Sequence, residues 1–186
     1  GVPSKTNAHP HVSGNCTGSA SGPVESEVVG VHNGIIENYQ ELKEKLLRKG
    51  YTFYSATDTE VAVNLVDYYY KKYLGTPVDA INHAMVRIRG SYALAIMFKD
   101  YPGEIYVARK DSPMILGVTD GDCFVASDVP AILKYTRTII LAIWKWHVWQ
   151  MVRSPFTIWM VMRLRSSRHR SSGTQRQRRK LALNTL

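Results

Sequence analysis

The hydrophobic pattern changes near Ser91, and this change constrains the fold more than any other feature of the sequence. Before it, apolar residues recur at helical spacing in three segments. After it, Tyr92–Phe98 forms a continuous apolar run, which is typical of a strand covered on both faces. The order of one strand, several helices and then several strands predicts an α+β fold with a sheet under helices, not alternating βαβ units.

The three helical segments have recognisable ends. The apolar stripe that begins at Tyr39 predicts a helix that Gly50 stops in a left-handed conformation. Thr57 and Glu60 have the spacing of a reciprocal capping box, which opens a helix that we expect to end at Gly75. A third helix is expected to begin near Pro77, which suits a first helical turn.

Short strands and turns account for the rest of the first 140 residues. Asn33-Gly34 predicts a tight turn with positive φ, and Asp128 is suited to cap a short helix over 129–133. The other predicted strands are Val28–Val31, Tyr51–Tyr54, Glu104–Ala108, Met114–Val118 and Cys123–Ala126.

Charge divides the chain into two parts of different composition. Residues 1–140 carry 14 basic and 15 acidic side chains, a net charge of −1. Residues 141–186 carry 10 basic and no acidic side chains, together with all four tryptophans. The overall charge of +9 therefore comes from the second part, a basic Trp/Arg-rich tail, and does not by itself indicate a nucleic-acid partner for the first.

The sequence excludes several classes of protein. The two cysteines, Cys16 and Cys123, are too few for a disulfide framework and lack the spacing of metal ligands. We therefore expect no metal, no cofactor and a reducing, cytoplasmic setting. No run approaches the roughly 20 apolar residues of a membrane span, so we expect no membrane partner.

Three polar motifs carry the chemistry, and each has an ordinary structural explanation. Asn7–His11 contains two histidines that, without a third ligand, are expected to be exposed in a loop. His32–Tyr39 contains the Asn-Gly pair, and Thr57–Glu60 contains the capping box. Taken singly, a turn and a helix cap explain the last two.

Together, in this order and spacing, the three motifs resemble one family. Residues 1–140 are similar to the glutaminase domain of the glutamine–fructose-6-phosphate aminotransferase (isomerizing) family, which belongs to the class II glutamine amidotransferases. The resemblance implies the N-terminal-nucleophile hydrolase fold, a four-layer αββα sandwich of which this chain is expected to form an incomplete version. It also extends to Gly50–Phe53, Arg89–Ala93, Ala108–Pro113 and Ala126–Asp128.

The resemblance also implies roles for individual residues. Asn33 and Gly34 would form an oxyanion hole, since a side-chain amide and a glycine N–H can converge on a developing oxyanion. Asp58 would bind the α-amino group of glutamine. His9 would lie near the glutamine pocket.

The sequence departs from the family in ways that bear on activity. The family's nucleophile is an N-terminal cysteine, to which neither Cys16 nor Cys123 corresponds. We therefore expect this chain to be a fragment that does not hydrolyse glutamine. The parent protein is expected to form a homo-oligomer and to contain sugar-isomerase domains on the same polypeptide, which the family uses to convert fructose 6-phosphate to glucosamine 6-phosphate.

The tail over 141–186 has no resemblance to the family in its own reading frame. Shifting the frame forces Trp146 with His147, and Trp149 with Gln150, to encode alanine, and permitted codons restore a sequence like the end of the domain. We therefore expect a frameshift near 139–141 and a tail without a native fold. The alternatives are a non-catalytic interaction remnant, or a basic tail that binds nucleic acid or an anionic surface through its arginines or favours a membrane interface through its tryptophans.

Overall fold

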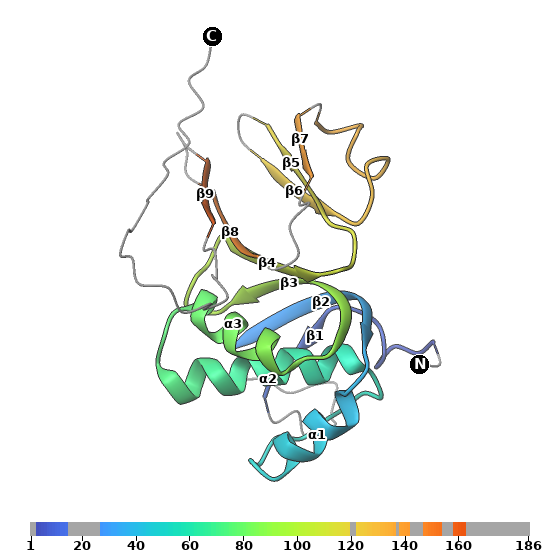
Figure 1. Ribbon diagram of the computed structural model, residues 1–186, viewed down its shortest axis with the longest axis vertical. Helices are drawn as coiled ribbons and strands as arrows, with labels where there is room; N and C mark the ends of the chain where they lie inside the picture. The colour runs from blue at the N-terminus through green and yellow to red at the C-terminus, as the bar shows by residue number, and fades with distance from the viewer. Residues whose placement is uncertain are drawn as a thin grey trace, which may run out of the picture.

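The computed structural model describes residues 3–14, 27–119 and 122–136, together with the backbone of three further strands. The chain forms three helices and nine strands within these residues (Figure 1). The elements are β1 (His11–Val12), β2 (Val28–Ile36), α1 (Tyr39–Leu47), α2 (Asp58–Tyr73), α3 (Pro77–Arg87), β3 (Gly90–Phe98), β4 (Glu104–Lys110), β5 (Ile115–Val118), β6 (Cys123–Ala126), β7 (Thr138–Leu141), β8 (His147–Arg153) and β9 (Ile158–Met162).

A six-stranded antiparallel sheet forms the centre of the molecule. Its strand order is β1-β2-β3-β4-β8-β9. The long pairing of β2 with β3 runs from Val28 opposite Phe98 to Ile36 opposite Gly90. Side chains alternate between the two faces of a strand, so β2 turns Val28, Gly30 and His32 toward the helices. The expected α+β class, with the sheet under helices, is confirmed.

The helices lie together on one face of this sheet, as Figure 1 shows. Helix α2 packs against β1 and β2, α3 packs against β4 and α2, and α1 packs on α2. Most of the interface is apolar, which is what stabilises a helix that covers a sheet, although α2 also buries Glu60, Asn64 and Asp67. Fully buried members of this core include Val61, Val63, Ile81, Tyr92, Leu94 and Ile96.

A second, three-stranded sheet has the order β6-β5-β7. Met114 and Leu116 of this region pack with Ala93 and Val107 on the face of the six-stranded sheet that the helices leave free. The described residues thus give three layers, a helical layer and two sheets. A second helical layer, which the expected four-layer sandwich requires, is not present among them.

Several local predictions are confirmed and others are wrong. Helix α1 is followed by Gly50 at φ +87°, as expected, and Pro77 opens α3. However, Leu74, not Gly75, takes the left-handed position that ends α2. The segment over 51–54 forms no strand: the Tyr51 N–H donates to the Leu46 carbonyl at the end of α1, and the Tyr54 N–H donates to the Glu60 carboxylate. Asp128 accepts from the Ala131 N–H in a series of turns instead of a helix.

The predicted tail over 141–186 lies mostly outside the described residues. Within it the structure gives the backbone of β8 and β9, and β8 pairs with β4 along the edge of the central sheet. The predicted frameshift concerns the gene and stays a prediction. In the described part of the chain, no helix is both long and apolar enough to cross a membrane.

Candidate functional site

The start of helix α2 is held by a buried carboxylate. Thr57 has an extended backbone, and its Oγ1 accepts a hydrogen bond from the Glu60 N–H at 3.3 Å. The reciprocal half of the predicted capping box is wrong. The fully buried Glu60 carboxylate instead accepts from the N–H groups of Tyr54 and Ser55, at 2.8 and 2.7 Å, and from the Ser55 hydroxyl. These donors compensate the cost of burying a charge and fix the loop before α2.

Asp58 is the first residue of α2, and strand β2 holds it from two points. Its Oδ2 accepts from the Ile36 N–H at 2.9 Å, and its Oδ1 lies 3.7 Å from Nδ1 of His32. The helix N-terminus favours a negative charge at this position. With 26% of its side chain exposed, Asp58 is anchored and still accessible to a ligand.

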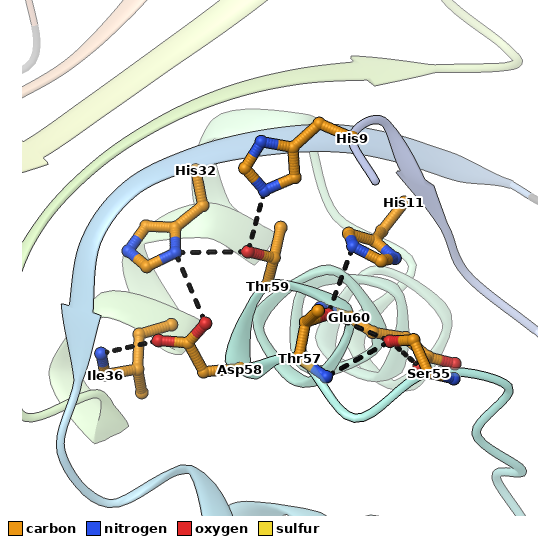
Figure 2. A network of polar contacts seen from close by, with 9 residues as sticks. All are labelled: His9, His11, His32, Ile36, Ser55, Thr57, Asp58, Thr59 and Glu60. Atoms are coloured by element: carbon orange, nitrogen blue, oxygen red, sulfur yellow. Dashed lines mark hydrogen bonds and ion pairs between the residues drawn. The ribbon is translucent and has the colours of Figure 1, made fainter. Parts of the chain in front are cut away.

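The Thr59 hydroxyl joins two histidines beside Asp58. Figure 2 shows Nε2 of His9 and Nδ1 of His32 both directed at Thr59 Oγ1, at 3.0 and 3.2 Å. Burial lowers the pKa of His32, and although Asp58 opposes this shift, the net direction is downward. The lowered pKa favours the neutral form of the His32 ring at pH 7, and among the described residues its buried Nε2 has no hydrogen-bond partner.

His11 was expected to be exposed in a loop, and this prediction is wrong. It lies in β1 and is fully buried, with Nδ1 2.9 Å from the Tyr54 hydroxyl and Nε2 3.1 Å from Thr57 Oγ1. Burial, with a smaller contribution from His9, lowers the pKa of His11. His9 itself is exposed, as expected.

Asn33 and Gly34 lie within β2, opposite Ala93 and Tyr92 of β3. The predicted tight turn is wrong, since the strand continues through both residues to Ile36, but the positive φ is confirmed, at +125° for Gly34. A Cβ at Gly34 would lie 2.2 Å from the Ser91 carbonyl oxygen. Only glycine therefore allows β2 to approach β3 this closely.

The structure brings these predicted residues to one place. Asn33 and Gly34 lie between His32 and Ile36, the two β2 residues that contact Asp58. Asn33 is exposed, and His9 reaches the same region through Thr59. The site thus has an accessible carboxylate at a helix N-terminus, and Asn33 and Gly34 lie on the short stretch of β2 between the two residues that contact it.

Sequence reasoning missed three side chains of this cluster, His32, Thr59 and Tyr54. His32 directly precedes Asn33-Gly34, and Thr59 lies inside the capping motif. Both therefore belong to the polar motifs of the sequence, but neither motif indicates a role for them. Among the described residues, no group of three His, Cys, Asp or Glu side chains is placed to hold a metal.

Comparison with known proteins places this geometry in context. A family profile described as a glutamine amidotransferase domain matches residues 19–134. The chain is 49% identical over 140 residues to glutamine–fructose-6-phosphate aminotransferase [isomerizing] of Pyrococcus horikoshii, covering 75% of this chain and 22% of the relative. It is 50% identical over 139 residues to the protein of the same name from Caldanaerobacter subterraneus, covering 75% and 21%. The chain therefore spans about a fifth of the length of these curated relatives.

Solved structures confirm the expected fold. Glutamine phosphoribosylpyrophosphate amidotransferase from B. subtilis, complexed with ADP and GMP, matches with a TM-score of 0.62 at 24% identity. The match covers 76% of this chain and 30% of that one. A structure titled as the allosteric regulatory enzyme of purine biosynthesis matches with the same TM-score and identity. Both have the N-terminal-nucleophile type of fold.

Proposed function

Because the chain belongs to the glutamine amidotransferase domain family, we propose that residues 1–140 bind glutamine within a glutamine–fructose-6-phosphate aminotransferase. The observation that carries the proposal is the anchoring of Asp58 beside Asn33 and Gly34. In such a protein, the glutamine amide nitrogen passes to fructose 6-phosphate, giving glucosamine 6-phosphate and glutamate. The sugar-isomerase domains, the homo-oligomer and the cytoplasmic location belong to this proposal.

Asp58 is suited to hold the α-ammonium group of glutamine. One carboxylate oxygen is committed to the Ile36 N–H at 2.9 Å, which fixes its direction. A neutral His32 beside the other oxygen does not neutralise the carboxylate. An ammonium group would therefore meet a partly buried carboxylate, where a charge-assisted hydrogen bond is strong.

Asn33 and Gly34 are suited to stabilise the oxyanion that forms when the glutamine amide is attacked. A side-chain amide and a backbone N–H that are already in position need no reorganisation during the reaction. The fixed backbone of Gly34, at φ +125° against β3, supplies that rigidity. His9, at the exposed edge of the cluster, would contribute to the wall of the glutamine pocket.

The nucleophile has no counterpart in the described site. Cys123 lies in β6 of the three-stranded sheet, away from the cluster around Asp58. We therefore expect the 186 residues alone to release no glutamate from glutamine, measured by a coupled glutamate dehydrogenase assay. Glutamate release that Asn33→Ala abolishes would contradict this expectation.

A chimera tests the proposed role of Asp58. The 140 aligned residues of the Pyrococcus horikoshii relative are replaced by those of this chain, and glutamate release is measured against glutamine concentration. Asp58→Asn keeps the size of the side chain and removes its charge. We expect the KM for glutamine to rise about a hundredfold, with a smaller change in kcat.

The matched control is Glu44→Gln, the same acid-to-amide change on the exposed surface of α1, which should leave both constants unchanged. An unchanged KM in Asp58→Asn would show that another group holds the ammonium. A chimera that is inactive before any substitution would contradict the proposed function itself.

A further inference from the structure

A pocket of about 390 Å³ lies among the three helices, on a different part of α2 from the site around Asp58. Leu65, the first α2 residue that lines it, is seven residues beyond Asp58, about 10 Å along the helix. Its lining residues are Leu42, Lys45, Leu46, Arg48, Lys49, Leu65, Tyr68, Tyr69 and Arg87. Its volume lies in the range of pockets that bind small organic molecules.

The inner wall of this pocket is apolar and aromatic. Leu42 and Leu46 of α1 and Leu65 of α2 are buried members of the main core. The rings of Tyr68 and Tyr69 lie edge to face, with centroids 5.2 Å apart. An aromatic ring in a ligand would find both an apolar surface and edge-to-face partners here.

The rim of the pocket is basic. Lys45, Arg48, Lys49 and Arg87 line it, and no acidic residue does. Lys45 pairs with Glu41, whereas within the described part of the chain no ion pair forms at Arg48, Lys49 or Arg87. Cations near the C-terminal ends of α1 and α3 are also favoured by the helix dipoles. The dipoles do not explain, however, why the cations of both helix ends line the same apolar pocket.

We propose that this pocket binds a small organic anion with an aromatic body. The ring would pack against Tyr68, Tyr69 and the leucines. Its phosphate or carboxylate would face the two guanidinium groups, whose planar donors suit such oxyanions. This inference is independent of the proposed glutamine site, because none of the residues around Asp58 lines the pocket.

Equilibrium dialysis of the full chain against 1-naphthyl phosphate tests the proposal. Two partial ligands separate its components: 1-naphthol has the ring without the charge, and inorganic phosphate has the charge without the ring. We expect the complete ligand to bind at least tenfold more tightly than either part, with an affinity that falls as salt is added.

Substitutions locate the binding. Arg48→Gln combined with Arg87→Gln should weaken 1-naphthyl phosphate about tenfold and leave 1-naphthol unchanged. Tyr68→Leu, which keeps an apolar side chain but removes the ring, should weaken both aromatic ligands. The matched control, Lys5→Gln with Lys99→Gln, removes two exposed cations that do not line the pocket and should change nothing.

Two results would overturn the proposal. One is the absence of saturable 1-naphthyl phosphate binding at millimolar concentration by a chain whose circular dichroism shows the expected helix content. The other is equal weakening by the pocket pair and the control pair, since this would mean that net charge alone attracts the anion.

Discussion

At the scale of the residue, the geometry of the site depends on polar side chains that each have few possible hydrogen-bond partners. Asp58 is held by the Ile36 N–H, and Thr59 links His9 with His32. A buried polar group that loses its hydrogen-bond partner lowers the free energy of unfolding by about 1–3 kcal/mol. Each hydrogen bond therefore restricts the position of the next side chain. His32 and Thr59 therefore belong to the cluster because they position neighbouring side chains. No sequence motif indicates this role.

Gly34 should be the least replaceable glycine of the site. Gly34→Ala places a Cβ 2.2 Å from a backbone oxygen at a φ of +125°. We expect it to lower the free energy of unfolding by about 3 kcal/mol or more, measured by urea denaturation.

The control for Gly34 is Gly50→Ala. Gly50 also has a positive φ, of +87°, but a Cβ there would meet no atom within 4 Å. This substitution should cost only about 1 kcal/mol. Equal costs at the two positions would mean that close packing against β3 is unimportant.

The two buried histidines should make stability depend on pH. Burial is the largest cause of the lowered pKa of both His11 and His32, so below the unfolded value of about 6.5 the unfolded chain binds more protons than the folded one. The free energy of unfolding should therefore fall as the pH drops from 7 through 6.5 toward the folded pKa values.

Urea denaturation between pH 5 and 7.5 measures the slope of the free energy of unfolding against pH. His11→Gln and His32→Gln should each reduce it, whatever they do to stability at pH 7. An unchanged slope in the double variant would contradict the assignment to these two groups.

At the scale of the element, the sequence predicts most of the structure where one periodicity dominates. Helices α1, α2 and α3 have apolar stripes at helical spacing, and β3 has a short apolar run of strand length; their predicted positions agree with the structure. Strand β2 was predicted too short, because Asn33-Gly34 is locally a turn signal. The long-range pairing with β3 outweighs that turn signal, and no local sequence pattern predicts this pairing.

The candidate site also depends on long-range contacts that local sequence patterns do not predict. Asn33, Gly34, Asp58 and His9 were identified through a family resemblance, and the capping hydrogen bond at Thr57 through spacing alone. The role of Glu60 could not be predicted, since its donors come from the loop folded over it. Nor could the burial of His11, which depends on the pairing of β1 with β2.

The end of α2 offers a stabilising substitution. Leu74 ends the helix in the left-handed conformation at φ 44°, with 91% of its surface exposed. Leu74→Gly should raise the free energy of unfolding by about 1 kcal/mol, because glycine adopts this conformation without steric cost.

Leu47→Gly provides the matched comparison, since Leu47 is an exposed leucine at the last position of α1 with helical geometry. There the same change should lower the free energy of unfolding by about 1 kcal/mol. The same sign at both positions would contradict the assigned conformation of Leu74.

At the scale of the whole molecule, the chain has a nearly neutral part and a strongly basic part. The neutral part holds the family match, the helical layer, both functional clusters and most of the two sheets. The net charge of +9 therefore says little about the partners of residues 1–140. The substrate proposed for that region is instead glutamine, held at the start of α2.

The most direct test of the glutamine site is a crystal structure of the chimera with a bound, unreactive glutamine analogue. The account predicts the α-ammonium group within about 3 Å of the Asp58 carboxylate, and the side-chain carbonyl oxygen at a similar distance from the Asn33 amide nitrogen. An analogue bound with its ammonium group away from Asp58, or with its carbonyl directed away from Asn33 and Gly34, would contradict it.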